Sequence, residues 1–396
     1  MLRLHARAQT RWHADPVVLR VSTDPLRATP FRGREAYLVG PDCRDIPNGF
    51  AAYLAIESAA PAPSVDQSEA PVCILPQSMA YLANGDVVRI SPTTGHVSVL
   101  YRRESRFNSM LLTEQCNSNC LMCSQPPKAV DDRHLAEIYM QAIPLMDPNT
   151  TELGITGGEP TLLGERLLDL IVACKTLLPK TSLHMLSNGR LFNYLSLCQD
   201  VADIAHPDLV IGIPLYSDIA SRHDFVVQAH GAFDQTMRGI MNLQRCGQRV
   251  EIRVVLHRHT IDRLPQLARF LGRNLPFVEH VALMGLEPMG FARLNLDALW
   301  IDPTEYRSTL SEAVRSLVRH HMNVSIYNHQ LCTLNEELWP YARKSISDWK
   351  NEYLDVCANC DMRSECGGFF SSGSIRHSTQ IHPIVRNQSA QKTIQS

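Results

Sequence analysis

Residues 109–123 read Ser-Met-Leu-Leu-Thr-Glu-Gln-Cys-Asn-Ser-Asn-Cys-Leu-Met-Cys. The first five form a mostly apolar run, which predicts a β-strand. Cys116, Cys120 and Cys123 follow on the loop that leaves this strand. Thiolates are soft ligands that favour iron–sulfur clusters or zinc, and an odd number of them leaves a coordination position open. We therefore predict a metal site that performs chemistry, with a zinc site completed by His134 as the alternative.

Strand and helix patterns alternate after this loop. Further strands are predicted at residues 152–156, 182–186, 209–214, 250–256 and 280–284, and helices at 133–143, from about 165, and at 231–245, 264–271 and 303–320. Repeated βα units predict a parallel sheet with right-handed crossovers. Six units fit an incomplete barrel or a doubly wound sheet, and in both the ligand is expected at the C-terminal ends of the strands.

The regions that flank these βα units have different residue patterns. Residues 1–105 are predicted to be a β-rich domain, because residues 86–90 and 96–101 flank a Gly-containing loop that is typical of a hairpin. Residues 59–68 are rich in Pro, Ala and Ser and are predicted to be a loop or linker. A sheet edge of this domain could recognise an extended peptide by strand addition. The alternative is that the domain covers the barrel and has no other role.

The C-terminal part is expected to contain three pieces after the barrel region of residues 106–325. These are a short strand beyond about residue 324, a cysteine-rich segment at 326–372, and a polar, unstructured tail at 373–396 with few large apolar residues.

The composition is that of a globular protein. The chain has 396 residues, 44% of them hydrophobic, and a formal net charge of −2, which gives no electrostatic footprint for nucleic acid. The sequence contains no apolar run long enough for a membrane helix and no signal-peptide pattern. We expect a soluble cytoplasmic protein whose 12 cysteines are metal ligands or buried thiols.

Gly157-Gly158-Glu159-Pro160 follows the strand predicted at residues 152–156. Two glycines let a ligand approach the backbone, and Glu159 offers an acceptor for a ligand ammonium group. Pro160 is suited to the start of the next helix. This motif is weak alone but strong one βα unit after the three cysteines.

Together, the Cys-x3-Cys-x2-Cys and Gly-Gly-Glu-Pro motifs resemble those of radical S-adenosylmethionine (SAM) enzymes. The resemblance implies an incomplete (β/α)6 barrel in which Cys116, Cys120 and Cys123 hold a [4Fe-4S] cluster. It also implies that the fourth iron chelates SAM, and that one electron cleaves SAM to a 5′-deoxyadenosyl radical. In such enzymes the protein binds, orients and secludes the cofactor.

The resemblance further implies which residues contact SAM. Gly157, Gly158 and Glu159 would contact its amino group. Its ribose or carboxylate group would be contacted by Ser187, Asn188 and Ser217. Ordinary turn chemistry is the alternative for these three. Arg253 would contact the SAM carboxylate or the substrate, or else be a solvated charge.

A second group of cysteines comprises Cys332, Cys357, Cys360 and Cys366. It resembles the auxiliary-cluster segment of peptide-modifying radical SAM enzymes and predicts one more [4Fe-4S] cluster, with a four-thiolate zinc site as the alternative. If Cys332 is a ligand, the site is closed and suits electron transfer. If it is not, an open iron could hold substrate. Three other cysteines are predicted to be buried thiols, namely Cys174, Cys198 and Cys246.

From roughly residue 80 to 372, the chain resembles the C-type radical SAM maturase of the His-Xaa-Ser system. Besides both cysteine groups, the resemblance rests on residues 154–161, 185–190 and 284–290. It implies a His-Xaa-Ser-type substrate peptide, made by the ribosome and then modified, with a second radical SAM maturase and an electron donor as partners. One alternative is a radical SAM enzyme that acts on a small molecule, like the molybdopterin-precursor cyclase. Another is a zinc-stabilised binding module without enzyme activity.

Overall fold

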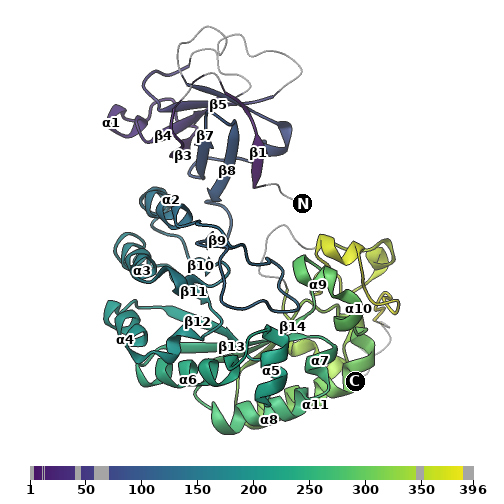
Figure 1. Cartoon of the computed structure of the whole chain (residues 1–396). Coiled ribbons are helices and arrows are strands. Elements are labelled where there is room, and N and C mark those ends of the chain that lie inside the picture. The colour runs from purple at the N-terminus through teal and green to yellow at the C-terminus, as the bar shows by residue number, and fades with distance from the viewer. Residues whose placement is uncertain are drawn as a thin grey trace, which may run out of the picture. The chain divides into compact units, whose positions relative to one another are not determined.

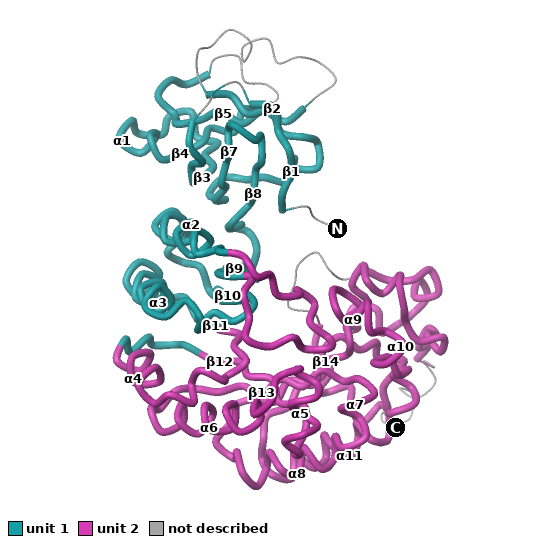
Figure 2. Tube along the Cα trace, viewed as in Figure 1, with its two compact units in different colours: residues 1–113, 131–184, 204–209 teal, residues 114–130, 185–203, 210–396 magenta. Residues whose placement is uncertain are grey.

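The computed structural model describes residues 4–10, 12, 14–40, 46–57, 71–344 and 352–386. The linker predicted at residues 59–68 and Cys43 lie outside the described residues. Figure 2 shows that the chain forms two compact units. The first contains residues 1–113, 131–184 and 204–209, and the second contains residues 114–130, 185–203 and 210–396.

The N-terminal region forms an eight-stranded sheet in the order β1-β8-β7-β3-β4-β5-β6-β2. Its strands are β1 (His5–Arg7), β2 (Gln9–Thr10), β3 (Val17–Ser22), β4 (Glu35–Leu38), β5 (Ala52–Ile56), β6 (Val72–Leu75), β7 (Val87–Ser91) and β8 (His96–Tyr101), and the short helix α1 spans Thr29–Arg32. The predicted hairpin is β7–β8, which pair antiparallel. Its inward residues Ile90 and Val97 are fully buried in the core of this sheet.

This sheet closes on itself through the first residues of the chain. β1 pairs with β8 and β2 pairs with β6, at the two ends of the strand order, yet only Ala8 separates β1 from β2. One bent segment therefore joins both ends of the sheet. Because closure removes the long free edges that strand addition needs, the described strands disfavour peptide recognition by that route. The role of residues 1–105 stays a prediction.

The second sheet has seven strands in the order β15-β14-β13-β12-β11-β10-β9. They are β9 (Asn108–Leu111), β10 (Glu152–Thr156), β11 (Ser182–Leu186), β12 (Leu209–Pro214), β13 (Arg249–Leu256), β14 (His280–Gly285) and β15 (Val324–Tyr327). The strand pairs β9–β10, β12–β13, β13–β14 and β14–β15 are all parallel. The predicted α/β class is confirmed, and the short strand expected after residue 324 extends the parallel sheet as β15.

Helices connect the parallel strands (Figure 1). They are α2 (His134–Ala142), α3 (Glu165–Leu177), α4 (Leu195–Ile204), α5 (Ala220–Val227), α6 (Ala232–Arg245), α7 (Arg258–Ile261), α8 (Leu264–Asn274), α9 (Gly290–Leu294), α10 (Leu296–Leu299) and α11 (Arg307–Arg319). The helix predicted at 303–320 begins instead with a 3₁₀ turn, Pro303–Tyr306, capped by Asp302. In the described parts of the chain, no helix is long and apolar enough to cross a membrane.

The cysteine-rich region after β15 contains short 3₁₀ helices and turns, and the predicted tail continues it. The prediction of an unstructured tail is wrong for the residues up to Arg386. The amide of Arg386 donates to Asp361 Oδ2 at 2.7 Å, and the Ser378 hydroxyl donates to Asp302 Oδ1 at 2.8 Å. Specific hydrogen bonds help to hold this segment, and a count of apolar residues does not detect them. Residues 387–396 lie outside the described residues.

Candidate functional site: two groups of cysteines

The loop that carries Cys116, Cys120 and Cys123 is closed at its base. The amide of Lys128 donates to the carbonyl of Glu114 at 2.9 Å, and its ammonium group contacts the Glu114 carboxylate at 2.6 Å. These contacts bring the two ends of the loop together. The three cysteines therefore lie on one loop whose ends, Glu114 and Lys128, are joined.

Backbone contacts from two other elements fix the middle of this loop. The amides of Asn119 and Leu121 donate to the carbonyls of Val227 and Val226, at the end of α5. On the other side, the Asn295 side chain donates to the carbonyl of Leu121 at 2.8 Å. The end of α5 and the segment around α9 therefore fix the position of the loop.

The end of the loop is clamped at Cys123. Its carbonyl accepts from the amide of Phe291 at 2.8 Å. Gly290 precedes this donor with φ +53°, and a Cβ atom there would lie 2.5 Å from the carbonyl oxygens of Cys123 and Ser124. Both its conformation and its close approach require glycine. The motif quoted at residues 284–290 therefore positions the first cysteine group.

Side chains that follow β11 hold the start of the loop. Arg190 Nη1 donates to the carbonyl of Asn117 and, at 3.1 Å, to Ser118 Oγ. Asn188 Nδ2 donates to Asn117 Oδ1 at 2.6 Å and lies 3.8 Å from Cys116 Sγ. Asn188, predicted to contact the cofactor, thus touches the cysteine loop directly. Arg190 also brings a positive charge next to the thiols.

The three thiols are close enough for their charges to interact. Burial, together with the charges of Cys123 and Cys116, raises the pKa of the Cys120 thiol to about 12. Burial also raises the pKa of Cys123, whose thiol donates to the carbonyl of Gln125 at 2.9 Å. A bound metal cluster would relieve this penalty, because its positive charge stabilises thiolates.

Tyr216 lies beneath the loop, in an apolar cluster that includes Met122 and Val226. Burial raises the pKa of its phenol, and the charges of Cys120 and Cys123 act in the same direction. The ring of His223 stacks on its ring and that of His257 lies tilted beside it, and burial lowers their pKa values to about 4 and about 3. These histidine rings are neutral at pH 7, so they add no charge to the apolar cluster that packs against the cysteine loop.

The other predicted cofactor contacts of this unit make turn and sheet interactions. Ser187 Oγ accepts from the amide of Gly189, and Ser217 Oγ accepts from the amide of Ile219. These are the turn interactions considered as the alternative. Arg253 Nη1 donates to Glu251 at 2.7 Å, on the face of β13 opposite the buried Ile252. Their roles toward SAM stay predictions.

The Gly-Gly-Glu-Pro motif is part of the first unit. The amide of Gly158 donates to the carbonyl of Thr113 at 2.8 Å, and a Cβ on Gly157 would lie 2.5 Å from that oxygen. The glycines are thus needed for the protein's own packing. Glu159 is fully buried, and its Oε1 accepts from the amide and hydroxyl of Thr161 at 3.1 and 2.6 Å. A SAM contact by this motif stays a prediction.

The second cysteine group lines a single cavity of about 340 Å³. All four predicted ligands face it, namely Cys332, Cys357, Cys360 and Cys366. The charges of Cys366 and Cys357 both act on Cys332. Sequence spacing left Cys332 the least certain ligand, and the fold places it with the others. The remaining wall is mainly apolar and includes the buried side chains of Met362 and Phe369.

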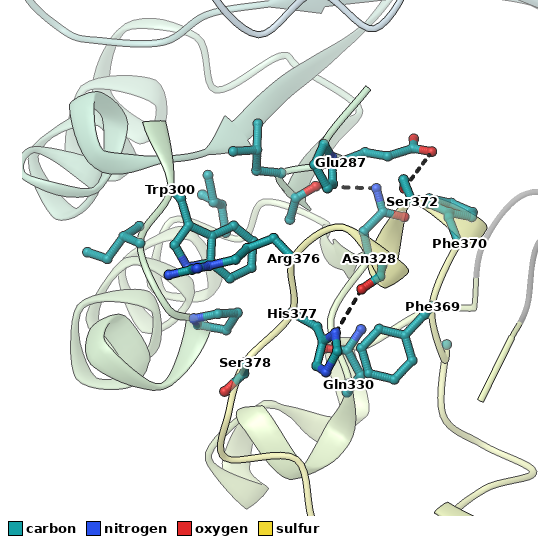
Figure 3. A pocket seen from close by; sticks show the side chains of 18 of the residues that line it. Glu287, Trp300, Asn328, Gln330, Phe369, Phe370, Ser372, Arg376, His377 and Ser378 are labelled. Atoms are coloured by element: carbon teal, nitrogen blue, oxygen red, sulfur yellow. Dashed lines mark hydrogen bonds between the residues drawn. The ribbon is translucent and has the colours of Figure 1, made fainter. Parts of the chain in front are cut away.

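A larger cavity of about 660 Å³ lies where β13, β14 and β15 end (Figure 3). Trp300 and Phe370 give it aromatic walls, and Arg376 lies over the Trp300 ring at 5.7 Å. Glu287, which accepts from Ser372 Oγ at 3.4 Å, adds a carboxylate. The cavity shares Gln330, Gly368 and Phe369 with the four-cysteine cavity. The sequence did not indicate Trp300 or Arg376, because chain segments far apart bring them together.

The cysteines predicted to be structural behave differently. Cys174 and Cys198 are fully buried, as predicted, and Cys246 is half-buried. Cys73 is buried in the N-terminal core. His134, the alternative zinc ligand, begins α2 in the first unit.

The donor sets fit iron–sulfur clusters chemically. All seven cysteines of the two groups are free thiols that are neither fully buried nor fully exposed. Each group has interacting sulfur atoms, next to apolar side chains that would exclude water from a cluster. Within the described ranges, no three His, Cys, Asp or Glu side chains are arranged around a single metal ion.

Several known proteins are similar to this chain. SuiB of Streptococcus suis is 15% identical, with a TM-score of 0.43 over 58% of this chain and 49% of SuiB. The structure of native anSMEcpe with bound AdoMet and Cp18Cys peptide is 16% identical, with a TM-score of 0.41 over 55% and 62% of the two chains. A radical SAM methyltransferase from Sphaerobacter thermophilus is 12% identical, with a TM-score of 0.41 over 63% and 74%.

The alignment with SuiB thus spans about half the length of that protein. The model of the Radical SAM superfamily matches residues 110–271, from β9 through α8. This range contains the three-cysteine loop, the Gly-Gly-Glu-Pro motif and five of the parallel strands. The chain therefore carries a radical SAM domain, the domain of an enzyme superfamily.

Proposed function

We propose that this chain is a radical SAM peptide maturase that modifies a His-Xaa-Ser-type peptide made by the ribosome. When bound, a [4Fe-4S] cluster and SAM supply the electron and the 5′-deoxyadenosyl radical that takes a hydrogen atom from the substrate. The work of the protein is to hold these groups, exclude water and position the peptide.

The observation that carries the proposal is the adjacency of two cavities within one unit. The four-cysteine cavity and the larger cavity at the strand ends share Gln330, Gly368 and Phe369 as a common wall. A cofactor held by the four cysteines would therefore lie one residue layer from a molecule in the larger cavity. This arrangement supports a second [4Fe-4S] cluster that exchanges electrons with bound substrate.

The cysteine loop has the features needed to hold the SAM-binding cluster. Cys116, Cys120 and Cys123 would be its ligands, while Arg190 and the amide of Phe291 fix the loop. Asn188 is within reach of both the loop and a ligand beside Cys116. The resemblance assigns further SAM contacts to Gly157, Gly158, Glu159, Ser187, Ser217 and Arg253.

The larger cavity suits a peptide segment. Its lining combines aromatic, charged and polar side chains, which is typical of sites that bind a ligand. Trp300 and Phe370 offer apolar contact, and Glu287 and Arg376 offer one charge of each sign. Glu287 could accept a hydrogen bond from an imidazole or hydroxyl of the peptide.

The proposal is tested by anaerobic turnover. Cluster-loaded protein, SAM and a strong reductant should release 5′-deoxyadenosine, and a His-Xaa-Ser peptide should change in mass only when all three are present. Iron and sulfide analysis of the same preparation distinguishes clusters from zinc. Full cluster loading without 5′-deoxyadenosine or a mass change would refute the proposal. Turnover of a nucleotide without turnover of the peptide would favour the small-molecule alternative.

The partners follow from the same proposal. In the proposed scheme, an external reductant delivers the electron to the SAM-binding cluster. A second radical SAM maturase would act on the same peptide. Co-purification of the tagged peptide with both maturases, compared with each maturase alone, measures whether they share it.

A further inference from the structure

The segment from Ser378 to Arg386 runs across the four-cysteine cavity. We refer to these nine residues, Ser378-Thr-Gln-Ile-His-Pro-Ile-Val-Arg386, as the strap. Three of its residues, Ile381, His382 and Ile384, line the cavity together with the four cysteines. The strap was predicted to be part of an unstructured tail, so its position at this site is a result of the fold.

The strap is anchored at both ends. At its start, Ser378 Oγ donates to Asp302 Oδ1 at 2.8 Å. At its end, the amide of Asp361 donates to the carbonyl of Ile384 at 2.9 Å, and the amide of Arg386 donates to Asp361 Oδ2 at 2.7 Å. Asp361 directly follows Cys360, so this second anchor ties the strap to the cysteine segment itself.

Between the anchors, the strap directs a backbone amide at a cysteine sulfur. The amide of Ile384 donates to Cys360 Sγ at 3.3 Å. Pro383, which precedes this donor, has no N–H of its own. The strap is therefore hydrogen-bonded to the cysteine segment at a sulfur atom as well as at Asp361.

We propose that the strap completes the four-cysteine site, by sealing it with Ile381 and Ile384 and by setting the reduction potential of the cluster held there through the hydrogen bond from the amide of Ile384 to Cys360 Sγ. This inference rests on the proposed second cluster. Hydrogen bonds to cluster sulfurs and exposure to solvent are the protein's main means of tuning such potentials. An amide donor stabilises the reduced, more negatively charged cluster more than the oxidised cluster, and so raises the potential.

The first test removes one donor and keeps the strap. Ile384→Pro deletes the N–H that reaches Cys360. Val385→Pro is the matched control, because within the described residues the amide of Val385 donates no hydrogen bond. Both are made in a full-length Cys116→Ala/Cys120→Ala/Cys123→Ala background, so that only the C-terminal cluster gives a signal. Potentiometric titration followed by electron paramagnetic resonance measures the potential.

Ile384→Pro should shift the midpoint potential to a more negative value, while Val385→Pro should leave it at the value of the background. Iron and sulfide are measured first in each protein. Zinc in place of iron would overturn the second cluster, and the electronic role of the strap with it. A loaded iron–sulfur cluster with the same potential in both variants would overturn the strap proposal alone.

The second test removes the seal. A chain ending at Gln380 lacks Ile381 and Ile384, whereas a chain ending at Arg386 keeps the whole strap and serves as the control. Loss of visible absorbance in air should be severalfold faster for the shorter chain and unchanged for the longer one. Equal bleaching rates of two equally loaded proteins would refute the sealing role, even if the proline variants shift the potential.

Discussion

The two cysteine groups belong to the same unit and are supported in different ways. The three-cysteine loop is held through its backbone, by Arg190, Asn295 and the amide of Phe291, which are far from it in sequence. In the four-cysteine group, backbone amides donate to the sulfur atoms themselves, from Ile384 to Cys360 Sγ and from Gly368 to Cys366 Sγ.

The two kinds of support suit two different ways of holding a cofactor. A loop fixed by its carbonyls keeps its sulfur atoms in place and leaves space beside them for a further ligand. A cavity with four thiols and amide donors on the sulfurs satisfies its cofactor completely. In the proposed function, the first group would bind a reactant and the second group would store or pass electrons.

Removing one thiol from each group tests most directly whether the two groups have different roles. Cys120→Ala should reduce 5′-deoxyadenosine formation to background, because two thiolates cannot hold the SAM-binding cluster. Cys357→Ala should retain measurable SAM cleavage but lose the modified peptide. Chromatography and mass spectrometry measure both products.

The control is Cys198→Ala, which removes a fully buried thiol of α4. It should keep both products. Equal losses of SAM cleavage in Cys120→Ala and Cys357→Ala would contradict the division of roles.

A backbone change should disrupt the first group almost as strongly. In Gly290→Ala, the added Cβ would meet two carbonyl oxygens of the cysteine loop at 2.5 Å. We expect severalfold less iron per chain and a comparable loss of SAM cleavage. The matched control is Gly247→Ala, where φ is also positive, at +70°, but no atom lies within 4 Å. Both substitutions carry the left-handed backbone cost of about 1–2 kcal/mol, so only the contact with the loop differs. Similar iron contents in the two variants would contradict the clamp.

Arg190 should have an intermediate effect. Arg190→Ala deletes charged donors to Asn117 and Ser118, contacts of a kind that contribute about 1.5–3 kcal/mol each. Since other contacts still hold the loop, we expect the cluster to assemble but SAM to bind about tenfold more weakly. Arg190→Lys should recover part of the affinity, and Arg245→Ala, at the end of α6, should change nothing. Isothermal calorimetry with cluster-loaded protein measures these affinities, and a loss as large in Arg245→Ala would argue against a local role.

The sequence was sufficient for the parallel strands. Five strands after the cysteine loop were predicted within one residue of their observed bounds, because buried apolar runs such as residues 209–214 leave little choice of structure. Cysteine spacing also indicated which thiols lie together, and the fold brings the four C-terminal cysteines to one cavity. Their role as cluster ligands stays a prediction.

The sequence was insufficient where function depends on contacts between distant segments. Asn295 reaches Leu121 across 174 residues, and no local pattern records such a contact. The strap shows the same limit. It contacts the cysteine segment through backbone amides, which every residue except proline carries, so no residue pattern predicts these contacts. Closure of the N-terminal sheet depended on β1 and β2, which at three and two residues are too short for a periodicity to register.

The smallest expected effect concerns a buried histidine on each side of the comparison. Below the first group, His257 is buried, and no partner for its Nε2 exists among the described residues. Near the second group, His329 is fully paired: its Nε2 accepts from Tyr306 at 2.8 Å and its Nδ1 donates to the carbonyl of Tyr327 at 3.0 Å. Burial lowers the pKa of His329 from 6.5 to about 4. The neutral ring is therefore part of the structure near the closed site.

This pKa shift makes stability depend on pH in one direction. Between pH 6.5 and 4 the unfolded chain binds a proton that the buried ring of His329 refuses, so stability is present above this window and is lost as the pH falls through it. From pH 7 to pH 5, the loss due to this residue is about 2 kcal/mol. His329→Gln retains an acceptor for Tyr306 but does not titrate. Its destabilisation relative to the native chain should therefore be smaller at pH 5 than at pH 7 in urea unfolding of cluster-free protein. An equal difference at both pH values would show that the folded protein takes up this proton as readily as the unfolded chain does, and would contradict the lowered pKa of His329.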